Sequence, residues 1–274
     1  MAGRTIVITG ASDGIGAAAA RALAASGESV VLVGRSAAKT EALARELGVP
    51  HHLADYSRLS QVRRLAAELD DAYPRIDVLA NNAGGLMGAR TVTEDGHELT
   101  FQVNHLAGFL LTNLLLDKLI ASRASVIQTS SIAARLFSRL DLDDPDADRS
   151  YSAEAAYGSS KLANILFTRE LHRRFNDQGL AAAAFHPGVV GSNFAQEARG
   201  PMRWFYAVPL FKRTMRTTAQ GADQLVWLAS STPGVDWQSG LYYEKRRPAR
   251  SAAMAQDAQA AERLWDLSAE FVGV

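Results

Sequence analysis

A tyrosine and a lysine four residues apart carry the clearest chemical signal in the sequence. Tyr157 and Lys161 lie within a pattern that predicts a helix over residues 155–175. Side chains at positions i and i+4 share one helix face, so we expect the phenol and the ammonium to project together. A neighbouring ammonium favours the phenolate and moves the pKa of a tyrosine towards neutrality. Such a tyrosine can protonate a carbonyl oxygen or remove the proton of an alcohol.

The Tyr–Lys pair needs partners, because this spacing on its own also arises by chance. Ser130 and Ser131 follow one predicted strand, the segment 81–84 follows another, and Asn104 lies in the helix beyond it. Each of these polar residues alone fits ordinary turn or capping chemistry. Because the carboxyl ends of parallel strands meet at one sheet edge, we expect these residues to gather there with the Tyr–Lys pair.

A glycine-rich loop at 9–16 separates the first predicted strand from the first predicted helix. Its glycines are Gly10, Gly14 and Gly16. The first permits a tight turn, the second lets the backbone approach a pyrophosphate, and the third allows close packing of helix and strand. The helix N-terminus adds free N–H groups and a positive dipole end. This strand–turn–helix context predicts a dinucleotide site rather than a plain structural turn.

The end of the second predicted strand indicates which dinucleotide is bound. A carboxylate at this point would bond the ribose hydroxyls and repel a 2′-phosphate. The sequence instead has Gly34 followed by Arg35, whose guanidinium suits phosphate oxygens, and Lys39 one turn further on. Asp13 counts against this interpretation, since it could lie near the same phosphate. We therefore predict NADP(H) as the cofactor, the alternative being that Arg35 is a surface arginine.

Composition excludes several classes of protein. The chain has 274 residues, a formal net charge of zero and no cysteine. Such a balance argues against disorder and against a general nucleic-acid binder, and the lack of cysteine rules out a disulfide scaffold or a thiolate nucleophile. The histidines show no metal-ligand spacing, so we expect no metal site. The most apolar stretch, 109–120, is too short to span a bilayer. These features favour a cytoplasmic protein with no integral membrane segment.

Short apolar runs alternate with helical patterns along most of the chain. This alternation predicts an α/β protein: a single-domain, doubly wound Rossmann fold over 1–274, with a parallel sheet and helices on both faces. The expected strands cover 5–9, 30–33, 51–53, 77–80, 125–129 and 180–186. The expected helices cover 14–26, 37–47, 59–73, 99–120 and 155–175.

An aromatic segment at 200–211 interrupts this rhythm after the sixth predicted strand. Ligands of open α/β sheets bind beyond the carboxyl ends of the strands. We therefore predict a substrate lid at about 190–216. A surface or oligomer patch is the alternative, and membrane association through these aromatics is a third interpretation.

Taken together, these motifs resemble those of the short-chain dehydrogenase/reductase family over nearly the whole chain. The matching positions are 9–16, 81–84, Asn104, Ser131, Tyr157, Lys161 and 187–188. Within that family the chain is similar to the retinol dehydrogenase-like branch, on the segments 102–112, 156–164, 186–190 and 261–268.

The resemblance implies a role for each catalytic residue. Tyr157 is expected to be the acid/base, and Lys161 to tune it and to bind a ribose. Ser131 is expected to orient the substrate carbonyl, with Ser130 as the alternative. Asn104 is expected to hold a water in a proton relay with Lys161.

We predict the cofactor contacts from the glycine-rich loop, from the end of the second predicted strand and from the family resemblance. Asp55 and Tyr56 match an adenine-contacting pair, 82–84 the adenosine ribose side, and 187–192 the nicotinamide segment. The full expected set is Gly10, Ser12, Asp13, Gly14, Ile15, Gly16, Arg35, Ser36, Asp55, Tyr56, Asn82, Ala83, Gly84, Tyr157, Lys161, Pro187, Gly188, Val189 and Ser192.

The sequence thus predicts an NADP(H)-dependent oxidoreductase that interconverts a carbonyl and an alcohol on a small or medium lipophilic substrate. The alternative is a non-catalytic NADP-binding regulator built on the same fold. The resemblance further implies a homodimer or homotetramer.

Overall fold

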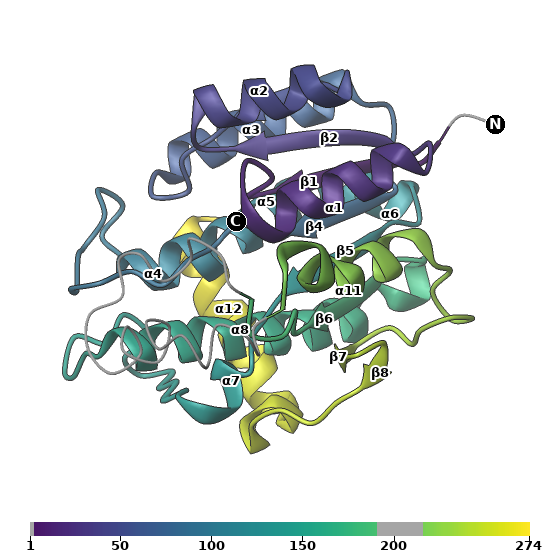
Figure 1. Ribbon diagram of the computed structural model, residues 1–274. Helices are drawn as coiled ribbons and strands as arrows, with labels where there is room; N and C mark the ends of the chain where they lie inside the picture. Colours follow the sequence, from purple (N-terminus) through teal and green to yellow (C-terminus); the bar gives the residue numbers. More distant parts are fainter. Residues whose placement is uncertain (1–2, 191–215) are drawn as a thin grey trace.

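The computed structural model describes residues 3–190 and 216–274, and within them the chain forms one eight-stranded sheet (Figure 1). The strand order is β3-β2-β1-β4-β5-β6-β7-β8. Every neighbouring pair is parallel except β7 and β8, which are antiparallel. The strands are β1 (Thr5–Thr9), β2 (Ser29–Gly34), β3 (His51–Leu53), β4 (Val78–Asn81), β5 (Ser125–Thr129), β6 (Ala181–Phe185), β7 (Leu241–Glu244) and β8 (Arg247–Pro248).

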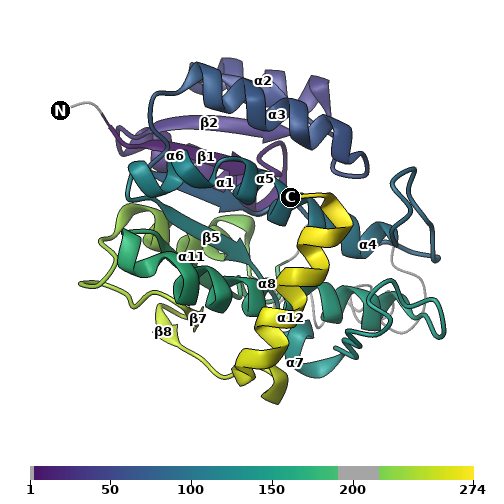
Figure 2. The same cartoon turned by 180° about the vertical axis from the view of Figure 1, so that it is seen from behind.

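Helices cover both faces of the sheet, as the two opposite views show (Figures 1 and 2). One face packs against α1 (Gly14–Ala25), α2 (Ala37–Leu47) and α11 (Thr218–Ser230). The other packs against α3 (Leu59–Ala72), α5 (Ala107–Leu114), α8 (Ala153–Phe175) and α12 (Ala258–Val272). The shorter helices are α4 (Leu99–Phe101), the π-helix η1 (Gln102–Leu106), α6 (Leu116–Ala121), α7 (Ala133–Leu136), and the 3₁₀ turns η2 (Asn176–Gln178) and η4 (Ala253–Gln256).

The strand side chains explain why the sheet is buried on both faces. Along β1, Ile6 and Ile8 join the core beneath α1 and α11, whereas Val7 joins the core beneath α5 and α8. Alternate residues of a strand point to opposite faces, so a continuous apolar run contributes side chains to both cores. This arrangement confirms the predicted doubly wound fold.

The expected continuous helix over 99–120 is wrong. The chain there forms α4, then the π-helix η1, then α5, and leaves helical geometry at Leu115 before α6. A π-helix widens one turn, which changes the direction in which its backbone carbonyls and side chains point. Here it turns the Asn104 carbonyl towards α8, where the Asn164 side chain donates to it. An apolar pattern cannot reveal this inserted turn, because every residue from Thr100 to Thr112 except Val103 is buried, so the segment has no exposed face whose shift would mark it.

The predicted substrate lid at about 190–216 falls almost wholly outside the described residues. Its two ends are described: Val190 pairs with Arg216 in an isolated bridge, and the Arg216 N–H donates to the Val189 carbonyl at 2.8 Å. Both ends therefore lie together just beyond β6. Within the described part of the chain, we find no helix that is long and apolar enough to cross a membrane.

Candidate active site

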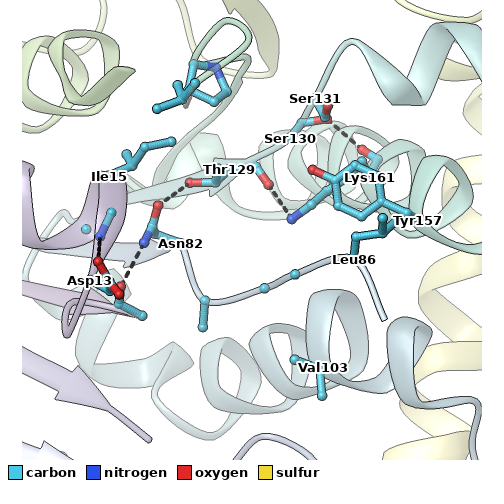
Figure 3. A pocket seen from close by; sticks show the side chains of 18 of the residues that line it. Asp13, Ile15, Asn82, Leu86, Val103, Thr129, Ser130, Ser131, Tyr157 and Lys161 are labelled. Atoms are coloured by element: carbon cyan, nitrogen blue, oxygen red, sulfur yellow. Dashed lines mark hydrogen bonds between the residues drawn. The ribbon is translucent and has the colours of Figure 1, made fainter. Parts of the chain in front are cut away.

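A cavity of about 1180 Å³ opens at the carboxyl ends of the central strands (Figure 3). Its walls come from the loop between β1 and α1, the ends of β2 and β5, the loop after β4, the first turns of α8 and the segment after β6. Ligand pockets for drug-sized molecules usually measure about 300 to 1,000 Å³. The space is therefore large enough for a dinucleotide together with a small substrate.

The glycine loop forms one end of this cavity. Gly10 has a φ of +63°, which favours glycine, and a Cβ on Gly16 would collide with the Gly10 carbonyl oxygen. Asp13 caps α1, and its Oδ1 accepts the Gly14 N–H at 2.7 Å. Ser12 and Ile15 also line the cavity. The N-terminus of α1 thus borders the space where an anion would be favoured.

The expected adenosine end contains an ion pair that the sequence did not indicate. Lys39 Nζ donates to Asp13 Oδ2 at 2.8 Å, and both side chains are about half exposed. Arg35 and Ser36 line the same rim, and Arg35 makes no ion pair with any described residue. Lys39, expected to add charge for a phosphate, is therefore already held by Asp13, whereas the guanidinium of Arg35 is available.

Asp55 and Tyr56 both line the cavity, but their side chains are engaged elsewhere. Asp55 Oδ1 accepts from the N–H of Ser57 at 3.0 Å and from its hydroxyl at 2.8 Å. The Tyr56 ring belongs to the core beneath α3, and burial raises the pKa of its phenol.

Asn82 follows β4, lines the cavity and bonds to the ends of β1 and β5. Its Nδ2 donates to the Thr9 carbonyl at 3.0 Å, and its Oδ1 accepts the Thr129 hydroxyl at 3.1 Å. The following residues, Ala83 and Gly84, continue the wall. The segment after β4 is thereby fixed against β1 and β5 (Figure 3).

Tyr157 and Lys161 lie side by side on α8 and face the cavity (Figure 3). Ser152 begins this helix by accepting the Ala155 N–H. Lys161 Nζ lies 5.7 Å from the centre of the Tyr157 ring and donates to the Thr129 carbonyl at 3.0 Å. Burial lowers the pKa of Lys161 to about 8. Its ammonium form is still the main one at neutral pH, next to the phenol.

The two serines after β5 have different environments. Ser130 is buried, and its hydroxyl donates to the backbone carbonyl of Lys161 at 2.7 Å. Ser131 lies in the cavity wall, and its Oγ accepts the Ala133 N–H at 3.1 Å, which leaves its O–H free to donate. Ser131 is the better placed of the two to bond a substrate oxygen.

Asn104 does not reach the cavity wall with the other predicted catalytic residues. Its Oδ1 accepts the Gly85 N–H at 2.8 Å, and its Nδ2 donates to the Gly85 carbonyl at 2.9 Å and the Ser160 hydroxyl at 3.0 Å. The polar atoms of this side chain therefore all bond to Gly85, in the loop that follows β4, and to Ser160 of α8. Its backbone carbonyl accepts from Asn164, so any water it holds would bind a second lone pair of that carbonyl.

Several residues of the site were not predicted from the sequence. The Thr129 carbonyl accepts a hydrogen bond from Lys161. The buried His186 lines the cavity, and its Nδ1 accepts the Ile132 N–H at 3.2 Å. Burial lowers the pKa of His186 to about 4, so it is neutral at pH 7. The position of His186 directly before Pro187 could have indicated its place in the site. The role of the Thr129 carbonyl could not be predicted, because a backbone group leaves no pattern in the sequence.

One side of the cavity has an apolar wall. Leu136 and Phe137 are 58% and 43% exposed, and Val189 is 40% exposed, although all three line the cavity. Large apolar side chains left exposed together around a cavity mark a binding surface. Pro187 and Gly188 complete this side, and Ser192 lies outside the described residues.

Fold and site together define a dinucleotide-binding oxidoreductase site in a doubly wound α/β protein. The short chain dehydrogenase family model matches residues 4–202. The chain belongs to the short-chain dehydrogenase family and is retinol dehydrogenase-like. Enzymes of this family use nicotinamide cofactors, and the names of the relatives below indicate carbonyl–alcohol interconversion.

Two relatives cover nearly the whole chain. A Streptomyces sp. (strain C5) protein named "Putative daunorubicin C-13 ketoreductase DnrU" is 46% identical, over 99% of this chain and 93% of that protein. Human retinol dehydrogenase 13 is 38% identical, over 99% of this chain and 85% of that protein.

Solved structures are similar as well. An uncharacterized Mycobacterium paratuberculosis protein shares 35% identity, with a TM-score of 0.80 over 99% of this chain and 94% of that chain. The Pseudomonas aeruginosa RhlG/NADP active-site complex shares 26% identity, with a TM-score of 0.69 over 88% of this chain and 94% of that chain.

Proposed function

We propose that this protein is an NADP(H)-dependent oxidoreductase that interconverts a carbonyl and an alcohol, with Tyr157 as the acid/base. The observation that carries the proposal is the placement of Tyr157, Lys161 and Ser131 around one cavity that also borders the N-terminus of α1. The phenol, the ammonium and a hydroxyl with a free O–H donor surround the same space.

Each catalytic side chain then has a defined task. Ser131 donates a hydrogen bond to the substrate oxygen and orients it. Tyr157 transfers its phenolic proton to that oxygen in the reduction, or accepts it in the oxidation. Lys161 stabilises the phenolate that remains, from its fixed place on the Thr129 carbonyl. The bound nicotinamide cofactor supplies or accepts the hydride.

The preference for NADP(H) rests on Arg35. The residue lines the cavity rim at the end of β2, where no carboxylate precedes it, and it has no ion-pair partner in the described ranges. A guanidinium in this place suits the oxygens of a 2′-phosphate. A solved relative that binds NADP is consistent with this preference.

A lipophilic substrate is supported by the apolar wall that Leu136, Phe137 and Val189 form. Two relatives are named for a daunorubicin C-13 ketoreductase and for a retinol dehydrogenase, names that agree with a carbonyl or an alcohol as the reacting group. We further propose that residues 1–274 form one domain, with a substrate lid at about 190–216, because the two described ends of that segment pair beside this wall.

A carbonyl panel tests the proposal directly. The oxidation of NADPH and of NADH would be followed with aliphatic, aromatic and polyene aldehydes and ketones, for the wild type and for Arg35→Ser. We expect turnover with NADPH on an apolar carbonyl, and a preference over NADH that falls by about tenfold in the variant, as the loss of a charged hydrogen bond implies. A wild-type preference for NADH would overturn the assignment of Arg35.

A further inference from the structure

A buried polar chain connects helix α12 with Lys161, behind the cavity. It consists of Ser268 on α12, His105 in the π-helix η1 and Asn164 on α8, which are 0%, 1% and 2% exposed. His105 Nδ1 lies 3.2 Å from Asn164 Oδ1, and its Nε2 lies 2.9 Å from the Ser268 hydroxyl oxygen. None of these three residues lines the cavity or belongs to the predicted catalytic set.

The hydrogen bonds of Asn164 determine which group donates and which accepts at each step from Asn164 to Ser268. Its Nδ2 donates to the Asn104 carbonyl at 3.0 Å and to the Thr129 carbonyl at 3.4 Å. Its Oδ1 therefore faces His105 and must accept a hydrogen bond, so Nδ1 carries the imidazole hydrogen. Nε2 is then the acceptor of the Ser268 hydroxyl. One neutral tautomer satisfies every member of the chain.

This series of hydrogen bonds ends at the Thr129 carbonyl, which also accepts from the Lys161 ammonium. Lys161 Nζ donates to the Thr129 oxygen at 3.0 Å, the same oxygen that Asn164 approaches. Burial lowers the pKa of His105 to about 4, so at neutral pH it adds no positive charge beside Lys161. The centre of the Tyr157 ring lies 5.7 Å from this ammonium nitrogen.

We propose that His105 is a positioning residue for Lys161, acting through the side-chain amide of Asn164. The inference rests on the proposed function, because it assigns His105 a part in the same acid/base chemistry. A buried amide that loses its donor at Oδ1 has no water to replace it. It rotates to find a partner and withdraws its N–H from the Asn104 and Thr129 carbonyls. The Lys161 ammonium then loses its fixed place and stabilises the Tyr157 phenolate less well.

Three substitutions at one position separate positioning from simple packing. His105→Asn can place an amide N–H where Nδ1 lies, and so keeps the bond to Asn164. His105→Gln places its amide near Nε2 and keeps only the contact with Ser268. His105→Leu keeps neither. A purely structural role would order these variants by stability, whereas positioning singles out the asparagine.

The first readout needs no turnover. Tyrosinate absorbance is titrated for each protein and for the same protein carrying Tyr157→Phe, and the difference reports the ionisation of Tyr157 alone. We expect the midpoint to rise by about one pH unit in His105→Gln and His105→Leu, which corresponds to a tenfold weaker stabilisation of the phenolate. In His105→Asn it stays within about 0.3 pH units of the wild type.

The second readout is kinetic. We expect kcat to fall by about tenfold in His105→Gln and His105→Leu, with the dissociation constant of NADPH changed less than about threefold. Thermal unfolding, measured for all three, identifies a variant that has not folded. Equal tyrosinate midpoints in all four proteins, or equal shifts in the asparagine and glutamine variants, would overturn the inference. If the wild type shows no turnover but the midpoints shift as described, the inference stands and the proposed function fails.

Discussion

Gly84 brings the backbone of the loop after β4 against the side chains of Asn104 and Lys161. A Cβ at this position would lie 2.6 Å from Asn104 Oδ1 and 3.0 Å from Lys161 Nζ. Since Asn104 is anchored to Gly85 by two hydrogen bonds, it has little room to move aside. We expect Gly84→Ala to displace the lysine ammonium and to lower kcat by about 10- to 100-fold. Steady-state kinetics with the best carbonyl substrate measures this.

The next residue provides a matched control. A Cβ on Gly85 would meet only the flexible end of Met87, at 3.5 Å. Gly85→Ala keeps the backbone N–H and carbonyl that hold Asn104, so we expect kcat within about twofold of the wild type. Equal losses in the two variants would show that the loop as a whole, rather than the contact with Lys161, limits activity.

The ion pair between Asp13 and Lys39 should influence how tightly NADPH binds. Their ion pair occupies the rim where Arg35 would meet a 2′-phosphate. Asp13→Ser keeps a side chain able to cap α1 but removes the carboxylate that repels the phosphate and holds Lys39. We expect the dissociation constant of NADPH to fall about three- to tenfold, and that of NADH to change much less.

Fluorescence titration of both cofactors checks this, with Lys39→Gln as the control that should weaken NADPH binding. An unchanged ratio of the two affinities in Asp13→Ser would place the 2′-phosphate away from this rim.

The site residues that the sequence could indicate are those with a chemical side chain at a regular spacing. Tyr157 and Lys161 share a helix face, and the glycine loop follows a strand, so both were predictable. The Thr129 carbonyl and the orientation of Asn104 were not, because they depend on backbone hydrogen bonds between segments that lie far apart in the sequence. The role of Asp13 also needed the structure, since its partner is 26 residues away.

At the scale of elements, an aromatic cluster fastens α12 to the rest of the fold. Trp265 packs against Phe109 of α5 and against Phe167 and Phe175 of α8, with ring centres 5.0 to 5.9 Å apart. We expect Trp265→Ala to lower the free energy of unfolding by about 3 to 5 kcal/mol through the cavity it leaves. Trp265→Phe should cost clearly less, because it keeps one ring in the cluster.

Urea unfolding followed by circular dichroism measures both changes. If the alanine variant lost less than about 1 kcal/mol, the cluster would contribute little and α12 would be held by other contacts.

Elements with a strong local pattern were predictable, and those defined by their partners were not. The strands β1 to β6 follow apolar runs that feed both cores, and they were expected close to their observed bounds. β7 and β8 are short, and they are strands because they pair with β6 and with each other at the sheet edge. In the π-helix η1, the Asn104 carbonyl accepts from Asn164 of α8 and His105 bonds to Ser268 of α12, contacts that no local pattern indicates.

At the scale of the whole molecule, two buried histidines make stability depend on pH. Burial lowers the pKa of both His105 and His186 from an ordinary value of 6.5 to about 4. Between these values the unfolded chain binds more protons than the folded protein, so the free energy of unfolding falls as pH decreases. We expect each histidine to contribute a loss of about 3 kcal/mol between pH 6.5 and pH 4. Above pH 6.5 neither contributes.

Thermal unfolding across this pH range measures the effect, and His105→Asn should flatten the dependence. His97 acts in the opposite direction, because its hydrogen bond to Asp146 raises its pKa, so its contribution is present at low pH and is lost as pH rises. A stability that is constant or increases from pH 6.5 to pH 4 would contradict the neutral, buried state of His105 and His186.

One comparison decides whether Tyr157 transfers the proton. It measures NADPH-dependent carbonyl reduction by the wild type and by Tyr157→Phe, with the dissociation constant of NADPH determined for both. We expect kcat to fall by about 100- to 10,000-fold in Tyr157→Phe, while NADPH binding changes less than about threefold. Turnover by Tyr157→Phe within about tenfold of the wild type would contradict the claim. A wild type that binds NADPH but reduces no carbonyl would instead favour a cofactor-binding regulator.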